Sequence, residues 1–315
     1  MTTKRNHLPQ LDGGLFITDA GLETTLIFHD GIDLPYFASY ALLRDREGTE
    51  RLRQYFALYG RLARDNKVGL ILDSPTWRAS ADWARKMGYS EAELATANEK
   101  SIELLAEIRD DYETDSSPIV LGGCVGPRGD GYDPGSIMTA DEAEAYHGKQ
   151  IRTFAETQAD MINALTMTNE NEAIGVARAS NAAGMPVAIS FTVETDGKLP
   201  TGQTLRDAIK AVDDATGNYP TYYMINCAHP DHFTHVLETG EPGLQRLRGL
   251  RANASRMSHA ELDNAEELDD GNPVELGSLF GDIRRRSPQI NVVGGCCGTD
   301  HRHIEHICHS SMSTA

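Results

Sequence analysis

The sequence predicts an α/β protein that folds as a single (β/α)8 TIM barrel. Three observations predict it: eight short apolar segments, amphipathic stretches between most of them, and turn residues after each segment. Eight strand-then-helix units favour a closed barrel, and a doubly wound open sheet is the competing arrangement. The predicted strands are 15–18, 68–72, 118–122, 161–165, 186–191, 222–225, 249–252 and 290–293.

Helices are predicted where apolar residues recur at helical spacing between consecutive strands. The stretch 50–67 is the clearest, because it places Leu52, Tyr55 and Phe56 on one face. The other predicted helices are 91–111, 140–159, 170–183, 204–216 and 303–310. This alternation of short strands and longer helices is what the crossover connections of a parallel sheet require.

One domain is expected, since no repeat, low-complexity tract or linker divides the 315 residues. Residues 1–14 are polar and predict a loose N-terminal lead-in, without the apolar centre of a secretory signal. The barrel is expected to cover 15–310. Within it, 261–272 is acidic and rich in turn residues, which predicts a solvated insertion before the last strand.

The composition is that of a soluble globular protein, with 40% hydrophobic and 24% charged residues. A net charge of −18 argues against binding to nucleic acid or to an anionic membrane surface. No apolar run approaches the ~20 residues that a membrane-spanning helix needs. We therefore expect a cytoplasmic protein, whose five cysteines stay reduced and serve as metal ligands or buried thiols.

Three of the cysteines follow strands that are near neighbours around a barrel. Cys227 ends the sixth predicted strand, and Cys296 and Cys297 end the eighth. The carboxyl ends of barrel strands share one face, so these thiols could meet there. Three thiolates suit tetrahedral Zn²⁺ with one position left open, which is the pattern of a catalytic site. The structural alternative is that Cys227 is a small buried hydrophobe, and that the glycines 294–295 and Gly298 only allow a tight turn.

An open zinc position suggests a thiol substrate. Free thiols have a pKa near ~8.5, so few are ionised at neutral pH, whereas a thiol that coordinates zinc loses its proton. The resulting thiolate can attack an electrophilic carbon. Hydrolysis by zinc-bound water is the alternative, although three sulfur ligands donate much charge and should weaken the metal as an activator of water.

Six short motifs lie at or near the ends of predicted strands. They are 18–21 (TDAG), 123–127 (GCVGP), 190–192 (SFT), 225–227 (INC) followed by Pro230, 251–254 (RANA) and 294–299 (GGCCGT). With these motifs the chain resembles the homocysteine S-methyltransferase family over almost its whole length. The resemblance implies a barrel methyltransferase whose zinc ligands are Cys227, Cys296 and Cys297.

The same resemblance implies which residues bind the substrate. The homocysteine-binding aspartate of the family corresponds to Asp19, although a turn-capping aspartate is the structural alternative. Thr166 retains the threonine of a family Glu-Thr pair at the end of the fourth strand. Asn226 either positions the substrate or braces its own turn, and Asn253 could reach the pocket from the end of the seventh strand.

Leu165 departs from the family pattern, which has a glutamate before that threonine. In the family this glutamate helps to hold the ammonium group of the amino acid, and a leucine cannot pair with a cation. Glu23, Glu170 or Glu172 could replace it, although each is more simply explained as a solvated helix or turn residue. Otherwise the acceptor is a thiol without an α-ammonium group in that place.

The predicted function is methyl transfer to a small thiol, with Zn²⁺ as cofactor. The resemblance implies homocysteine as the acceptor, giving methionine, and S-methylmethionine or S-adenosylmethionine as the sulfonium donor. Three alternatives stay open: a different thiol acceptor, a zinc hydrolase with Asp19 as its general base, and a zinc- or thiol-binding protein without turnover. The expected partners are therefore small molecules, and the oligomeric state stays open, with a homo-oligomer among the options.

Three groups of residues carry weaker signals. A run of histidines near the C-terminus resembles a metal cluster but is better explained by a solvated helix: His301, His303, His306 and His309. Cys124 is expected to be a packed thiol rather than a fourth ligand, and Cys308 a core residue. Trp77 and Trp83 could line the mouth of the pocket and attract a sulfonium cation, or could pack in the core.

Overall fold

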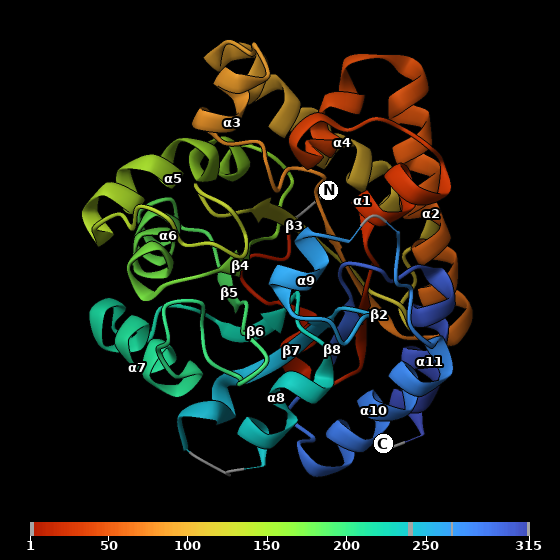
Figure 1. Ribbon diagram of the computed structural model, residues 1–315. Helices are drawn as coiled ribbons and strands as arrows, with labels where there is room; N and C mark the ends of the chain where they lie inside the picture. The colour runs from red at the N-terminus through yellow and green to blue at the C-terminus, as the bar shows by residue number, and fades with distance from the viewer. Residues whose placement is uncertain (1–2, 239–241, 266, 314–315) are drawn as a thin grey trace.

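Eight parallel strands close into a barrel in sequence order, which confirms the predicted TIM barrel and excludes the open sheet (Figure 1). The computed structural model describes residues 3–238, 242–265 and 267–313. The barrel closes where β1 pairs with β8, with Phe16 opposite Val292. The strands are β1 (Phe16–Thr18), β2 (Gly69–Asp73), β3 (Ile119–Val125), β4 (Met161–Met167), β5 (Val187–Phe191), β6 (Tyr222–Asn226), β7 (Leu247–Ala252) and β8 (Val292–Gly295).

Helices surround the barrel, and all six predicted helices are present with shifted ends (Figure 1). The predicted helices are α2 (Arg46–Asn66), α4 (Glu91–Tyr112), α5 (Ala140–Ala155), α6 (Glu170–Ala182), α7 (Leu205–Thr216) and α11 (His301–Met312). The helices that were not predicted are α1 (Leu22–Thr24), α3 (Ala81–Lys86), α8 (Pro230–Leu237), α9 (His259–Asp263) and α10 (Pro273–Arg286). Within the described ranges, no helix combines the length and the apolar character that a bilayer span requires.

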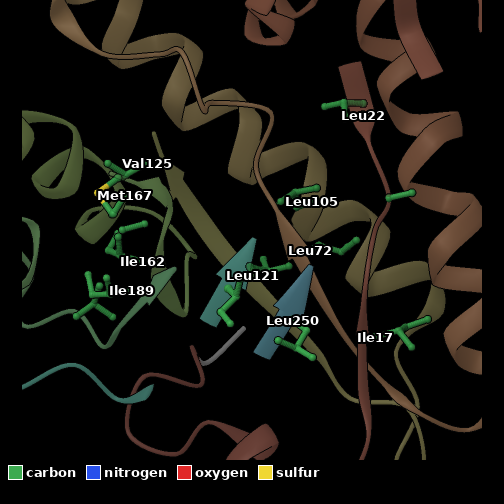
Figure 2. Packing of buried hydrophobic residues seen from close by; sticks show 14 of the residues in the cluster. Ile17, Leu22, Leu72, Leu105, Leu121, Val125, Ile162, Met167, Ile189 and Leu250 are labelled. Carbon is green, nitrogen blue, oxygen red and sulfur yellow. The ribbon is translucent and has the colours of Figure 1, made fainter. Parts of the chain in front are cut away.

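Side chains alternate along the strands between the barrel interior and the helices outside. Figure 2 shows Leu72, Leu121 and Ile162 in the outer layer, where Leu105 of α4 also packs. The lower interior forms a separate apolar cluster: Leu8, Phe16, Ile71, Val120, Met161, Ala188, Tyr222, Met224 and Val292. The same alternation places polar residues of β2, β4 and β7 in the interior layer above this apolar cluster, toward the C-terminal ends of the strands.

The N-terminal segment is not the loose lead-in that was expected from 1–14. A short 3-10 helix, η1 (Pro9–Asp12), follows Leu8, and both Leu8 and Gln10 are buried. Gln10 Nε2 donates a hydrogen bond to Tyr222 Oη over 3.4 Å. The segment closes the N-terminal end of the barrel, because the apolar interior would otherwise be open to water.

The end of β8 also differs from the expectation. The strand runs over Val292–Gly295, so the two glycines lie in the strand and only Gly298, at φ +78°, takes a left-handed turn conformation. A Cβ atom at Gly294 would overlap Thr18 Oγ1, and one at Gly295 would overlap Thr299 Oγ1. Glycine is therefore required here by close packing against neighbouring side chains.

Most described residues of the acidic insertion at 261–272 are exposed, although part of the insertion contacts the barrel. It begins inside α9, and its second half packs against the loops after β7 and β8. Ser255 Oγ donates a hydrogen bond to Asp269 over 2.6 Å, and His303 Nε2 donates one to the Asp270 carbonyl oxygen over 2.8 Å. These contacts tie the insertion to the same face of the barrel as the cysteines.

Gly294→Ala should lower the free energy of unfolding by about 1–3 kcal/mol, because the new methyl group must displace Thr18 in a close-packed interior. Urea denaturation of the purified protein measures this. Gly14→Ala is the matched control, since nothing lies within 4 Å of its Cβ position, and its effect should stay within about 0.5 kcal/mol. Equal effects of the two substitutions would contradict the packing argument.

Candidate metal centre and active site

The ends of β6 and β8 bring three sulfur atoms together. The Sγ atoms of Cys227, Cys296 and Cys297 all lie within 4.8 Å of one another, and that of Cys227 is 4.0 Å from that of Cys297. A tetrahedral zinc ion with bonds of about 2.3 Å to sulfur would separate its ligands by roughly 3.8 Å. The distance between Cys227 and Cys297 and the donor type fit a zinc ion held by thiolates, whereas Cys227 and Cys296 lie closer together than two ligands of one ion would. Across the described part of the chain, this is the one group of three or more candidate ligands found close together.

Cys227 and Cys296 are joined by a disulfide bond. These two sulfurs cannot be bonded to each other and also act as metal ligands, because a ligand must be a deprotonated thiol. Cys297 lies outside the disulfide and is open to solvent. The form that could bind a metal is therefore the one in which both thiols are reduced.

Backbone strain accompanies the cluster at two positions. Cys227 has φ +57° and Thr166 has φ +62°, a left-handed region that is unusual for residues with a side chain and most of all for a β-branched one. Such conformations cost on the order of 1–3 kcal/mol each and need support from their surroundings. Cys227 receives support on both sides: its N–H donates to the Arg251 carbonyl oxygen (3.1 Å), and its own carbonyl oxygen accepts from His259 Nε2 (2.7 Å).

Asn226 holds Thr166 in its strained conformation. The Thr166 N–H donates to Asn226 Oδ1, and Asn226 Nδ2 donates to Thr166 Oγ1, both over 2.8 Å. Ser190 Oγ donates a further hydrogen bond to Asn226 Oδ1 over 2.6 Å. The pairing of β4 with β5 shifts register between Ala164 and Met167, and such a bulge re-aims the side chains within it. Asn226 thus braces the end of β4, whereas the structural role expected from the sequence was to brace its own turn.

A cavity opens above the polar interior layer at the C-terminal ends of the strands. It brings together the three cysteines with Asp19, Thr166, Asn226 and Leu165, as the sequence suggested for a shared pocket. The remaining lining residues are Ala20, Gly21, Leu22, Glu23, Thr24, Asp73, Ser74, Pro75, Trp77, Cys124 and Arg251. Asn253 is buried beyond β7 and is not among the residues that line this cavity.

Arg251 forms the floor of the cavity between two carboxylates. Its Nη2 donates to Asp19 Oδ1 and its Nη1 donates to Asp73 Oδ2, each over 2.6 Å, while all three side chains are buried. Tyr55 Oη donates to the second oxygen of Asp19 over 3.1 Å, and Asn163 Nδ2 donates to the second oxygen of Asp73 over 2.5 Å. Every oxygen of these two carboxylates therefore already has a protein partner.

Burial governs the protonation of this group. Desolvation raises the pKa of Asp73 to about 6, against the opposing charge of Arg251 and with a further increase from Asp19. Desolvation likewise raises the pKa of Asp19, while Arg251 and Tyr55 act in the opposite direction. Burial alone would lower the pKa of Arg251, but the two carboxylates raise it overall. The guanidinium is thus always charged, and the carboxylates are the members that titrate.

The three glutamates considered as replacements for the family glutamate are in different places. Glu23 lines the cavity. Glu170 accepts a hydrogen bond from Gln203, and Glu172 accepts one from the Arg128 N–H and lies 2.9 Å from His147 Nε2. Neither Glu170 nor Glu172 lines the cavity, so only Glu23 shares it with the cysteines.

Tyr132 and His259 were not anticipated as neighbours of the cluster. Tyr132 Oη lies 3.5 Å from Cys297 Sγ, and its ring stacks on His259 at a centroid distance of 3.9 Å. His259 Nδ1 is 3.0 Å from Glu194 Oε1. Loops after β3, β5 and β7 therefore meet over the sulfur atoms, which no sequence signal had indicated.

Burial decides between the interpretations of the C-terminal histidines, the two remaining cysteines and the tryptophans. His303 is buried and caps α11, where its Nδ1 accepts from the Asp300 N–H, so the solvated-helix interpretation does not hold at this position. Cys308 lies in the core, whereas Cys124 is buried and also lines the cavity. Trp77 lines the cavity, but Trp83 is covered by Arg78 and Lys86 and is absent from the lining.

Comparison with known proteins decides the family. The family model described as homocysteine S-methyltransferase matches residues 16–310. The chain belongs to the homocysteine S-methyltransferase family. A selenocysteine Se-methyltransferase from Brassica oleracea var. italica is 26% identical over 91% of this chain and 86% of its own length. Homocysteine S-methyltransferase 2 from Arabidopsis thaliana is 24% identical over 91% of this chain and 90% of its own length.

Solved structures of the family share the fold. The homocysteine methyltransferase MmuM from Escherichia coli, in its metallated form, superposes with a TM-score of 0.75 at 18% identity, over 95% of this chain and 98% of that one. Its oxidised form gives the same TM-score and identity over 97% and 99%. As a homocysteine S-methyltransferase family member, the chain is a methyltransferase built on the predicted barrel.

Two residues that organise this family member's site were not predicted as site residues. Arg251 is a charged residue in a strand otherwise made of apolar residues and glycine except for Arg248, and Asp73 directly follows the apolar run 70–72. Both break the binary pattern of a buried strand, and that break was the available signal. Their contact with each other could not be read from sequence, because 178 residues separate them.

Asn226→Ala should destabilise the protein by about 2–4 kcal/mol, because its three hydrogen bonds with Thr166 and Ser190 are lost and the Thr166 groups are left without these partners in a buried site. Urea denaturation measures the loss, and the exposed Asn181→Ala is the control with an expected effect below about 0.5 kcal/mol. A loss of less than about 1 kcal/mol in Asn226→Ala would show that other contacts hold Thr166.

Asp73 should make stability depend on pH. Its folded-state pKa of about 6 exceeds the unfolded value of about 3.9. The folded state therefore binds more protons between these values, and the contribution of Asp73 to stability is lost as pH rises through about 6. The decline should be smaller in Asp73→Asn, measured by urea denaturation between about pH 4 and 7. Asp111→Asn, at an exposed position, should follow the wild type. If stability falls with pH equally in Asp73→Asn and in the wild type, Asp73 is not the group responsible.

Proposed function

We propose that the protein is a zinc-dependent S-methyltransferase that moves a methyl group from a sulfonium donor to a thiol acceptor. Homocysteine, giving methionine, is the proposed acceptor, with S-methylmethionine or S-adenosylmethionine as the donor. The observation that carries the proposal is the convergence of three cysteine sulfurs, from the ends of β6 and β8, on one cavity. The names of the two plant relatives, which act on homocysteine and selenocysteine, support an amino acid with sulfur or selenium as the acceptor.

Cys227, Cys296 and Cys297 would hold the zinc ion once the disulfide is reduced. Zinc bound there would lower the pKa of a substrate thiol that coordinates it, so that the thiolate forms near neutral pH. A reducing compartment such as the cytoplasm suits a cluster that loses its ligands on oxidation. The methyl transfer itself needs no oxidant or reductant, because the acceptor sulfur gains the methyl group that the donor sulfur loses.

The reaction itself is a displacement at carbon. The bond between donor sulfur and methyl carbon breaks as the bond to the acceptor sulfur forms, and the donor sulfur keeps the electron pair and becomes neutral. Such a reaction depends mainly on alignment of the two sulfurs with the methyl carbon and on exclusion of water. The cavity provides Leu165 and Trp77 as apolar walls, while Asn226 fixes Thr166 beside them.

Asp19 is proposed as a substrate-binding group of fixed orientation. Arg251 and Tyr55 hold its two oxygens, so a substrate would share the carboxylate with these partners rather than displace water from it. The same contacts weaken the hydrolase alternative. A hydrolase needs a general base that is available to a water molecule, and the side chain considered for that role is already engaged.

A methyl-transfer assay with homocysteine and each sulfonium donor tests the proposal. Protein that is reduced and loaded with zinc should bind one zinc ion per chain and form methionine, and a chelator should abolish both. Cys227→Ser, Cys296→Ser and Cys297→Ser should each lower kcat/KM by more than about 100-fold, since even groups that only orient a metal ligand contribute 10–100-fold.

Cys308→Ala is the matched control, because this thiol is buried in the core away from the cavity. It should keep the zinc content and the activity of the wild type. Zinc binding without transfer to any thiol would leave a metal- or thiol-binding role. Full activity in all three serine variants would show that the cysteine cluster is not the reaction centre.

A further inference from the structure

Glu23 lines the cavity, and its hydrogen-bond partners differ from those of Asp19 and Asp73, the other two carboxylates there. It lies in α1, directly after β1, and its side chain is partly buried. Ser39 Oγ donates a hydrogen bond to its Oε1 over 2.9 Å, and the Ser39 hydroxyl is itself buried. The carboxylate is thus held in place by a neutral donor at the edge of the space that contains the cysteines.

The charges around the cavity are not balanced. Asp19 and Asp73 share one guanidinium, that of Arg251, and each of them forms an ion pair with it. For Glu23, no ion pair with a cationic side chain exists among the residues that the structure describes. Burial raises the pKa of Glu23 and the charge of Asp19 adds to this increase, while hydrogen bonds from its backbone and from Ser39, and the more distant charge of Arg251, act in the opposite direction. A cation in the cavity would therefore be favoured at this carboxylate.

Arg78, whose charge acts on Glu23 from a distance, is committed elsewhere. Its guanidinium lies between the rings of Trp77 and Trp83, 4.0 Å from each centroid. It also donates a hydrogen bond to the Gly129 carbonyl oxygen over 2.7 Å and lies 3.5 Å from Asp130. These contacts fix the guanidinium against the aromatic rings, so it forms no ion pair with Glu23.

We propose that Glu23 binds the α-ammonium group of the thiol acceptor and thereby sets the specificity for an amino acid. The inference rests on the proposed function, and it assigns the ammonium to the β1 side of the cavity. The β4 side offers Leu165, which cannot pair with a cation, and the floor carboxylates, Asp19 included, could only share oxygens that already accept hydrogen bonds from the protein. Glu23 is the one lining group with a negative charge that lacks an ion pair within the described ranges.

Glu23→Gln tests the assignment, because glutamine keeps the shape and the Ser39 contact but removes the charge. With donor at saturation, the KM for homocysteine should rise about 10- to 100-fold, as for loss of a charge-assisted hydrogen bond, and kcat should change less than about threefold. The KM for the donor should stay unchanged. Glu23→Asp should recover part of the affinity, whereas the control Glu170→Gln, outside the cavity, should behave like the wild type.

The matched probe is 4-mercaptobutanoate, which is homocysteine without its amino group. Wild type and Glu23→Gln should methylate it with the same kcat/KM, because neither can use an ammonium contact with this thiol. Calorimetric titration of homocysteine into the zinc-loaded protein gives a second readout that needs no turnover, and its Kd should rise by the same factor as KM. The urea midpoint should not fall in Glu23→Gln, since an ion pair is not being removed.

The outcomes separate this inference from the proposed function. If wild type transfers no methyl group to any thiol, the proposed function fails, and an unchanged homocysteine Kd in Glu23→Gln would overturn the inference as well. If wild type is active but Glu23→Gln affects homocysteine and 4-mercaptobutanoate equally, or changes only the KM of the donor, the inference is overturned while the proposed function stands.

Discussion

The pairing of Arg251 with two carboxylates is the constraint on which the upper half of the barrel depends. A guanidinium buried at this depth costs on the order of several kcal/mol unless charge and hydrogen bonds are both matched. Asp19 and Asp73 provide that match at 2.6 Å each. Because the three residues come from β7, the end of β1 and the end of β2, the pairing ties these strands across the interior. It also fixes the chain that leads from Asp19 to Glu23.

The sulfur side of the cavity depends on strain that hydrogen bonds support. Cys227 and Thr166 both have positive φ angles, and Asn226 stands directly before the first and clamps the second. Strain that persists in a folded state requires neighbours that over-determine it, and such sites are already arranged for their ligand. A short polar network thus connects the position of one sulfur with the shape of the β4 wall, where Leu165 lies.

The barrel could be predicted from periodicity because the eight strands and six of the eleven described helices carry their own local pattern. Errors arose where tertiary packing overrides local composition. The polar segment around Gln10 closes the barrel because an apolar interior lies beneath it, and residue 294 must be glycine because Thr18 is too close for a side chain. Both depend on residues more than 200 positions away in the sequence, so no window of the sequence could reveal them.

Hydrophobic alternation and thiol-rich motifs are local properties, so the barrel, the family and the strand ends at which Cys227 and the pair Cys296–Cys297 lie could be predicted before the structure was known. Only the tertiary structure decided which carboxylates are already paired. Asp19 and Glu23 are four residues apart and equally acidic in sequence, yet the first contacts Arg251 and the second does not. The difference arises because the interior of a closed barrel brings β7 against the end of β1, and the available charge of a carboxylate depends on which counter-ion the fold places beside it.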